Sequence, residues 1–255
     1  MDEWFLGDLK LQSRLILGTG RYRSLQEMRI CHENAETEMV TVALRRIPVE
    51  ADGQPGLVDF IDTRKITLLA NTSGAYTGKE ALRLASLALE LEMKFLKIEV
   101  MGEQKTLLPD PVETLNAVKM IRSELGNRLF LMVYTSDDPV MALKLKESGA
   151  DAIMPAGSPI GSGRGIANPE NILMIRELLG KETRMIIDAG IGSPSDAAIA
   201  MELGADAVLL NTAVAAADNA PQMASAMKHG VVAGRMAYLA GRIPRKRFAT
   251  ASSPL

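Results

Sequence analysis

Cysteine is almost absent from the 255-residue sequence, which contains only Cys31. A disulfide within the chain is therefore excluded. Cys31 lies in the segment 28–35, which is predicted to be a helix behind the first strand. A lone cysteine in such a helix is expected to be a small apolar packing residue. If the protein carries out sulfur chemistry, something else must deliver the sulfur.

Histidine is scarce as well. His32 and His229 are the two histidines, and both are predicted to lie in helical regions, away from the carboxyl ends of strands. Proton transfers would then depend on carboxylates. No group of histidine, cysteine and acidic residues has the spacing of metal ligands, so we expect no metal site and no cofactor.

A strong excess of charge and a long hydrophobic run are both missing. The formal net charge is −2, so nucleic acid is not an expected partner, and the one basic cluster, 242–247, is predicted to be a solvated tail. No segment approaches the roughly 18 apolar residues that a membrane span needs. The first residues are acidic where a signal peptide would be basic, so we expect a cytoplasmic protein with no membrane partner.

Short aliphatic or β-branched runs alternate with longer segments of helical periodicity. This pattern is typical of a parallel sheet with helical crossovers, and roughly eight strands close a (β/α)8 TIM barrel. We therefore predict an α/β fold with residues 1–255 as one barrel domain and 242–255 as a candidate flexible tail. A doubly wound open sheet is the alternative, although no GxGxxG motif follows a strand. The predicted strands are 14–17, 39–43, 66–70, 95–100, 129–133, 152–154, 185–187 and 207–210.

The predicted helices share start and stop signals. A capping residue precedes proline at Asp110-Pro111, Asp138-Pro139, Asn168-Pro169 and Ser193-Pro194. Proline is tolerated at the first helical position because its missing N–H would have no partner there. The motif Gly-Ala-Asp-Ala follows two helices, beginning at Gly149 and Gly204, where glycine can end a helix in the left-handed conformation.

Polar residues at the predicted strand ends are the candidate site, because the active site of such a barrel lies there. Lys97 is the most informative of them. Side chains alternate along the strand 95–100, so its aliphatic residues should pack on helices while Lys97 and Glu99 point into the barrel. The candidates are Arg45, Asn71, Thr72, Lys97, Glu99, Tyr134, Asp188, Asn211 and Thr212.

Two chemical interpretations of Lys97 remain open on the residues alone. Desolvation would lower the pKa of its ammonium, and a neutral amine is what imine formation with a ketone requires. A purely structural pair between Lys97 and Glu99 inside the barrel fits the sequence equally well.

The segments 186–193 and 207–213 form the second candidate site, because they contain the ends of the last two predicted strands and the loops that follow. Loops at these positions form the usual phosphate site of the fold, because glycines let backbone amides approach an anion and helix N-termini favour its charge. Tight turns without a ligand are the simpler alternative. The glycine-rich loop 154–166 also suits backbone contacts to a ligand or a partner.

At these positions the sequence closely resembles bacterial thiazole synthase, in the same order over nearly the whole chain. The matching segments are 69–74 (LANTSG), 97–100 (KIEV), 107–115 (LLPDPVETL), 154–163, 188–192 (DAGIG), 204–213 and 233–254. Two departures stand inside strands, where Phe95 replaces the family's usual tryptophan and Ala70 its usual proline.

The resemblance implies a Schiff base on Lys97 and acid–base roles for Glu99 and Asp188. In that family 1-deoxy-D-xylulose 5-phosphate forms the imine and tautomerises. The thiocarboxylate of a sulfur-carrier protein supplies sulfur, and dehydroglycine from a producing enzyme condenses to close the thiazole phosphate. A homotetramer is expected. The residues implied to contact the sugar phosphate are Gly161, Ala189, Gly190, Asn211 and Thr212.

Two other functions remain to be separated from this one. One is a different imine-forming barrel on a pentulose phosphate, such as a pyridoxal-phosphate synthase subunit or an aldolase. The other is a catalytically inactive barrel that serves as a scaffold for the sulfur carrier.

Overall fold

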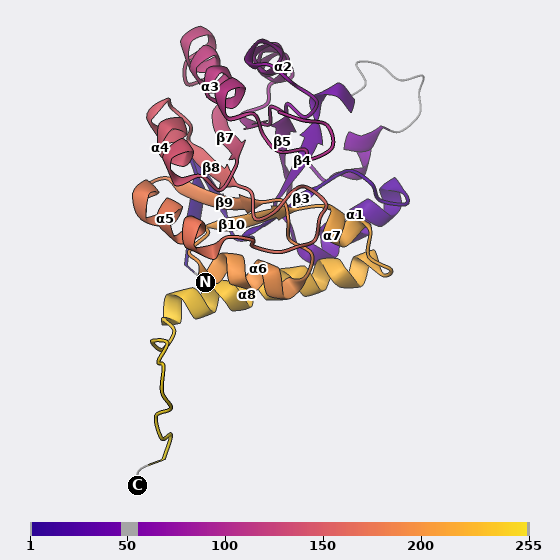
Figure 1. Cartoon of the computed structure of the whole chain (residues 1–255). Coiled ribbons are helices and arrows are strands. Elements are labelled where there is room, and N and C mark those ends of the chain that lie inside the picture. The colour runs from indigo at the N-terminus through magenta and orange to yellow at the C-terminus, as the bar shows by residue number, and fades with distance from the viewer. Residues whose placement is uncertain (1, 47–55, 254–255) are drawn as a thin grey trace.

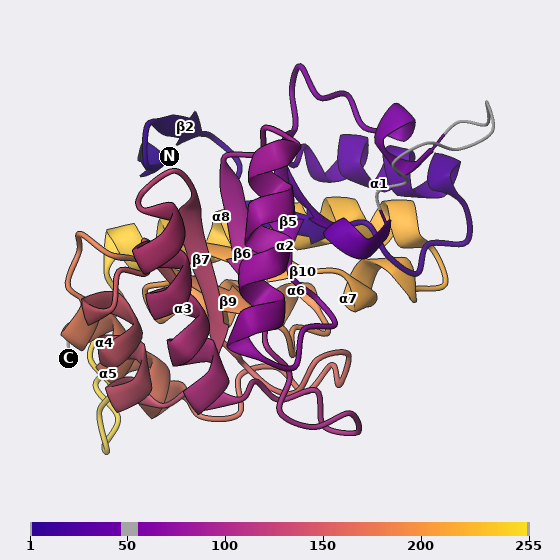
Figure 2. The ribbon, with the colours of Figure 1, turned by 90° about the horizontal axis from the view of Figure 1, so that it is seen from above.

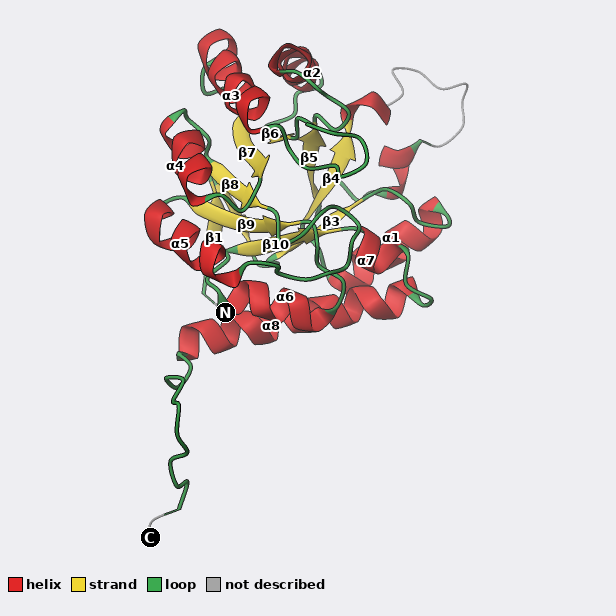
Figure 3. Cartoon of the chain, in the orientation of Figure 1, coloured by secondary structure: helices red, strands yellow, loops and turns green. Residues whose placement is uncertain are grey.

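Eight parallel strands close into a barrel in the computed structural model, which describes residues 2–46 and 56–253. The strand order is β10-β3-β4-β5-β6-β7-β8-β9, and Figure 3 shows the ring of strands inside a ring of helices. The predicted (β/α)8 barrel is therefore confirmed. The strands are β3 (Leu15–Gly18), β4 (Met39–Ala43), β5 (Thr67–Asn71), β6 (Phe95–Ile98), β7 (Phe130–Thr135), β8 (Ala152–Pro155), β9 (Arg184–Asp188) and β10 (Ala207–Leu210).

Helices follow the strands around the outside of the barrel (Figure 1). All four helices predicted from a capping residue and proline begin at that proline. The helices are α1 (Leu25–Ala35), α2 (Gly78–Glu90), α3 (Pro111–Leu125), α4 (Pro139–Glu147), α5 (Pro169–Leu179), α6 (Pro194–Glu202), α7 (Thr212–Ala215) and α8 (Ala220–Ala240), with 3-10 turns at Leu44–Arg46 and Leu57–Phe60. Within the described ranges, no helix has the length and apolarity that a membrane crossing requires.

The core has two layers because strand side chains alternate between faces. Outward-facing residues such as Val42 and Leu96 pack against the helices in one apolar cluster. Inward-facing residues such as Ile16, Leu69 and Met132 form a second cluster that fills the barrel. The inner cluster fills the barrel interior beneath the carboxyl ends of the strands. Polar side chains line the barrel at those carboxyl ends.

An N-terminal hairpin, not predicted from the sequence, covers the amino-terminal end of the barrel. Its strands β1 (Trp4–Leu6) and β2 (Leu9–Leu11) pair antiparallel. Trp4, Leu6 and Leu11 are buried in the same cluster as the barrel interior. Figure 2 shows the hairpin beyond one end of the barrel strands. Strands of three residues give almost no periodic signal, which explains the omission.

The two Gly-Ala-Asp-Ala repeats form the same structure. Asp151 accepts a hydrogen bond from the backbone of Leu131 at 2.6 Å and pairs with Arg122 of α3 at 2.5 Å. Asp206 accepts from Met185 and pairs with Arg176 of α5, both at 2.9 Å. In each repeat an aspartate thus joins the start of the preceding strand to an arginine of the helix that comes before that strand. Gly149 and Gly204 have the left-handed φ angles of 102° and 93° that were predicted for the helix ends.

Residues 242–253 extend away from the barrel after α8 (Figure 1) and form no helix or strand. Their side chains are exposed, including Ile243 and Phe248. This segment includes most of the predicted tail, while residues 254–255 lie outside the described part. The division of the chain into one domain and a flexible tail stays a prediction.

Helices α6 and α8 pack closely along one side of the barrel (Figure 1). The contact depends on glycine in α8. A methyl group at Gly230 would overlap the carbonyl oxygen of Pro194, and one at Gly234 would overlap that of Ala198. Both positions therefore let two helix backbones approach more closely than any other residue would allow.

Gly234→Ala should destabilise the protein by about 1–3 kcal/mol, because overpacking separates the helices. Glycine-to-alanine changes inside an unhindered helix normally stabilise by roughly 1 kcal/mol, so the sign of the change is diagnostic. Urea unfolding followed by circular dichroism measures it. An unchanged or increased unfolding free energy would contradict the proposed close contact.

Candidate active site

A cavity of about 890 Å³ opens at the carboxyl ends of the barrel strands. Its walls come from the ends of β3, β4, β5, β6, β9 and β10, from the loops that follow them and from the loop after β8. Thr72 and Tyr134 are buried and do not line the cavity, but Thr72 bonds to the backbone of Glu99 and the ring of Tyr134 faces Lys97. The remaining polar candidates all line the cavity, and they are Arg45, Asn71, Lys97, Glu99, Asp188, Asn211 and Thr212.

Lys97 forms ion pairs with two carboxylates inside the barrel. Its Nζ lies 2.5 Å from Asp188 Oδ2 and 3.0 Å from Glu99 Oε2, and each of the three side chains is at most 6% exposed. Leu96 and Ile98 point the other way and pack in the layer against the helices. The inward orientation predicted from strand alternation is therefore correct.

Neighbouring polar groups hold Glu99 in place. Asn71, which pairs with Lys97 in the β5–β6 register, donates from Nδ2 to Glu99 Oε2 at 3.1 Å. The Asn71 Oδ1 accepts from the backbone N–H of Ser73 at 2.9 Å, which sets the orientation of the amide. The Thr72 hydroxyl accepts from the backbone N–H of Glu99 at 2.8 Å. Glu99 is thus the more firmly fixed of the two carboxylates.

The protonation of Lys97 differs from the sequence-based expectation. Burial alone lowers the pKa of Lys97, but the negative charges of Asp188 and Glu99 outweigh burial and the net pKa is raised. The two carboxylates therefore favour the ammonium form of Lys97, and the lowered pKa expected from desolvation is wrong. The reason is that the fold brings Asp188 from β9 to the lysine, so two carboxylates surround one cation.

The two carboxylates differ in pKa direction. Burial raises the pKa of Asp188 above its ordinary value, and Lys97 only partly offsets that effect. Burial acts on Glu99 in the same way, but Lys97 and Asn71 outweigh it and the pKa of Glu99 is lowered. Three ionised groups would bury one net negative charge, and a proton on Asp188 removes that cost. Asp188 is thus the member of the cluster best suited to gain and lose a proton.

Tyr134 contributes its ring to the cluster. The Lys97 Nζ lies 5.1 Å from the centroid of the Tyr134 ring, an arrangement that stabilises a cation. Burial raises the pKa of the Tyr134 hydroxyl, which has no hydrogen-bond partner among the described residues. The phenol is therefore neutral, and its aromatic face is what meets the lysine.

The loops after β8, β9 and β10 meet at one side of the cavity. Ala189 and Gly190 have left-handed φ angles of 70° and 84°, and a Cβ atom at Gly190 would overlap the backbone of Ser158. Gly165 donates to the Gly190 carbonyl at 2.8 Å, which ties two of the loops together. The short helix α7 begins directly after β10. The cavity is lined by all of the residues implied to contact the sugar phosphate, namely Gly161, Ala189, Gly190, Asn211 and Thr212.

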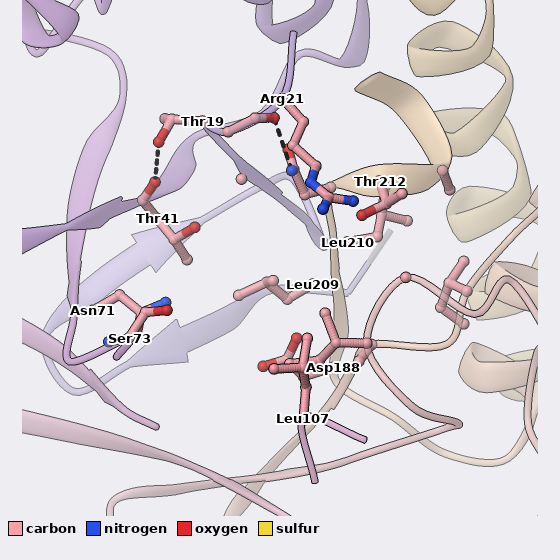
Figure 4. A pocket seen from close by; sticks show the side chains of 18 of the residues that line it. Thr19, Arg21, Thr41, Asn71, Ser73, Leu107, Asp188, Leu209, Leu210 and Thr212 are labelled. Atoms are coloured by element: carbon pink, nitrogen blue, oxygen red, sulfur yellow. Dashed lines mark hydrogen bonds between the residues drawn. The ribbon is translucent and has the colours of Figure 1, made fainter. Parts of the chain in front are cut away.

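The loop after β3 is a part of the site that sequence reasoning missed. It brings Gly18, Thr19, Gly20 and Arg21 to the cavity. Asn211 Nδ2 donates to the Gly20 carbonyl at 2.9 Å, as the dashed line beside Arg21 in Figure 4 shows. The signal available in the sequence was the pair of glycines directly after a predicted strand.

The histidine prediction needs one correction. His32 is buried, and its Nε2 lies 3.3 Å from the carbonyl oxygen of Gly18, at the carboxyl end of β3. It therefore does approach a strand end, because α1 packs directly behind β3. Burial lowers the pKa of His32, and the residue is not among those that line the cavity. His229 is exposed within α8.

Cys31 behaves as predicted. Its side chain is buried in the apolar layer between the barrel and the helices. Burial raises the pKa of the Cys31 thiol to about 11, which suppresses the reactive thiolate.

Comparison with known proteins settles the family. The model of the thiazole biosynthesis protein ThiG family matches residues 5–254. The chain belongs to the ThiG family. A thiazole synthase from Myxococcus xanthus is 51% identical over 98% of this chain and 94% of its own length, and one from Bacillus cytotoxicus is 52% identical over 98% and 96%. The predicted family and its enzymatic activity, thiazole synthesis, are thereby confirmed.

Solved structures agree with this assignment. A chain from the crystal structure of the Amycolatopsis orientalis BexX/CysO complex superposes with a TM-score of 0.82. It is 31% identical, and the match covers 95% of this chain and 97% of that one. The similarity thus extends over nearly the whole length of both chains.

Lys97→Met should lower the unfolding free energy at pH 8 by about 3–5 kcal/mol, because it leaves two buried carboxylates without their cation. The loss in unfolding free energy relative to the wild type should become smaller toward pH 5, since Glu99 and Asp188 can then take up protons that neutralise them. Urea unfolding at the two pH values measures the effect. Lys94→Met, an exposed position just before the same strand, is the matched control. An equal loss in both variants would contradict the role of the ion pairs.

Proposed function

We propose that Lys97 holds 1-deoxy-D-xylulose 5-phosphate as an imine while the thiazole ring is built. The observation that carries this proposal is the position of Lys97 Nζ, 2.5 Å from a proton-accepting carboxylate in a cavity that also contains the glycine-rich loops. A lysine amine can add to the ketone, and loss of water then yields the Schiff base.

Asp188 is proposed as the group that moves the protons. An ammonium cannot attack a ketone, so Lys97 must first give up a proton, and Asp188 is the nearer carboxylate with the raised pKa. Once protonated, Asp188 can return a proton to the departing hydroxyl or to the tautomerising sugar. Glu99, fixed by Asn71 and kept anionic, would stabilise the positive charge of the protonated imine.

The phosphate group is proposed to bind at the loops after β8, β9 and β10, through Gly161, Ala189, Gly190, Asn211 and Thr212. The left-handed backbone of these loops and the short helix after β10 support this role, because that arrangement is the usual phosphate site of the fold. The carbonyl end of the sugar would then reach down to Lys97.

The partners are proposed from the family. Sulfur would come from the thiocarboxylate of a sulfur-carrier protein, and the likeness to a chain of the BexX/CysO complex supports a protein partner. The burial of Cys31 agrees with an external sulfur source. Dehydroglycine from a separate enzyme, a homotetrameric assembly and a cytoplasmic location complete the proposal.

Borohydride reduction in the presence of 1-deoxy-D-xylulose 5-phosphate should trap a covalent adduct on the wild-type chain. Lys97→Ala should give no adduct, because it lacks the attacking amine, while the exposed control Lys94→Ala should trap as the wild type does. Intact-mass spectrometry and peptide mapping identify the site. An adduct on another lysine, or its persistence in Lys97→Ala, would rule out the proposal.

The same assay separates the alternative functions. A pyridoxal-phosphate-synthase-like or aldolase barrel should trap other pentulose phosphates more readily than the 1-deoxy sugar. A catalytically inactive scaffold should bind the sulfur carrier and trap no sugar.

Glu99→Gln should shift the pH dependence of trapping to lower pH. Glu99 is one of the two charges that raise the pKa of Lys97, so its removal lowers that pKa and exposes the neutral amine at lower pH. The initial trapping rate measured from pH 6 to pH 10 gives the midpoint. An unchanged midpoint, or one shifted to higher pH, would show that Glu99 does not control the lysine.

A further inference from the structure

We propose that Arg21 binds the phosphate group of the sugar substrate and selects phosphorylated over unphosphorylated ketoses. This inference rests on the proposed function and adds a residue from the loop after β3 to the phosphate site.

The position of Arg21 follows from a hydrogen bond between its neighbours. Asn211 Nδ2 donates to the Gly20 carbonyl at 2.9 Å, so the residues that come next in each loop, Arg21 and Thr212, are brought together. Both line the same cavity, and in Figure 4 the guanidinium of Arg21 points toward Thr212. Arg21 and Thr212 therefore line one cavity from two loops that a hydrogen bond joins.

The backbone at Arg21 is held in an unfavourable conformation. Its φ angle is 66°, in the left-handed region that costs a residue with a Cβ atom free energy. The flanking Gly20 is held by Asn211, and Thr19 Oγ1 donates to the Thr41 carbonyl at 2.8 Å. The loop is thus tied to β4 through Thr41 and to the end of β10 through Asn211, and Arg21 lines the cavity from this anchored loop.

The charges in the cavity favour such a residue. Two carboxylates lie at its base, and they would repel a phosphate dianion. Among the described lining residues the cations are Arg21, Arg45 and Lys97. Lys97 is engaged by the carboxylates, and the Arg45 guanidinium packs against Gly74 in the loop after β5. Arg21 is the remaining lining cation, and its neighbour Gly20 is bonded to Asn211, the residue before Thr212.

The chemistry of the side chain fits this role. A guanidinium presents two parallel N–H donors to two phosphate oxygens, and no described carboxylate lies within ion-pair distance of Arg21 to compete for them. Backbone amides of the glycine loops would bind the phosphate from one side, and Arg21 would bind it from the other.

Borohydride trapping with two substrates tests the inference. The half-saturating concentration is measured for 1-deoxy-D-xylulose 5-phosphate and for unphosphorylated 1-deoxy-D-xylulose. Arg21→Asn should raise the value for the phosphorylated sugar about 10- to 100-fold and leave the other unchanged, since charged hydrogen bonds of this kind are worth that much. Asparagine tolerates the left-handed backbone, so the loop is kept.

Two further variants act as controls. Arg21→Lys should restore part of the preference for the phosphorylated sugar, because it keeps the charge without the paired donors. Arg29→Gln removes one charge from the surface of α1, where Arg29 pairs with Glu33, and should behave as the wild type.

Inorganic phosphate gives a readout that does not depend on the imine. Calorimetric titration should show affinity reduced at least tenfold in Arg21→Asn and unchanged in Arg29→Gln. Equal loss of trapping for both sugars, or wild-type phosphate affinity in Arg21→Asn, would overturn the role of Arg21. If the wild type traps neither sugar, the proposed function fails, and the phosphate titration still decides the inference.

Discussion

The site depends on one constraint, which is that two carboxylates and one ammonium are enclosed together inside a barrel. An excess negative charge away from water is costly, so each member needs a compensating neighbour. Asn71 supports Glu99, the ring of Tyr134 faces Lys97, and the raised pKa of Asp188 makes that carboxylate the readier of the two to take up a proton. The strands that bring these residues together are held by the apolar layers on both faces. The packing of the apolar layers therefore determines which charged side chains meet inside the barrel.

The barrel itself could be predicted because its signals are local and repeated. Each of the four capped prolines, such as Pro139, begins a helix, and each barrel strand lies where the aliphatic runs placed it, within two residues at either end. The hairpin β1–β2 could not be predicted, because three-residue strands are stabilised by contacts with the barrel interior and have little periodicity of their own. The ion pairs of Asp151 and Asp206 explain in retrospect why the Gly-Ala-Asp-Ala motif recurs.

The candidate site was predictable in its residues and less so in its electrostatics. Strand alternation was sufficient to direct Lys97 inward. The protonation of Lys97 depends on Asp188, which is 91 positions away in the sequence and 2.5 Å away in space, so no local pattern could reveal it. Arg21 was missed for a similar reason, because its direction is set by the contact of Asn211 with Gly20 across the closure of the barrel.

The hairpin at the amino-terminal end has a consequence for the order of events. Trp4, Leu6 and Leu11 close the amino-terminal end of the barrel, so small molecules reach Lys97 through the cavity at the carboxyl ends of the strands. A macromolecule bound over that cavity would block this route for as long as it stayed bound. Small reactants would then have to bind before the macromolecule, and the thiazole product could leave only after the macromolecule had dissociated.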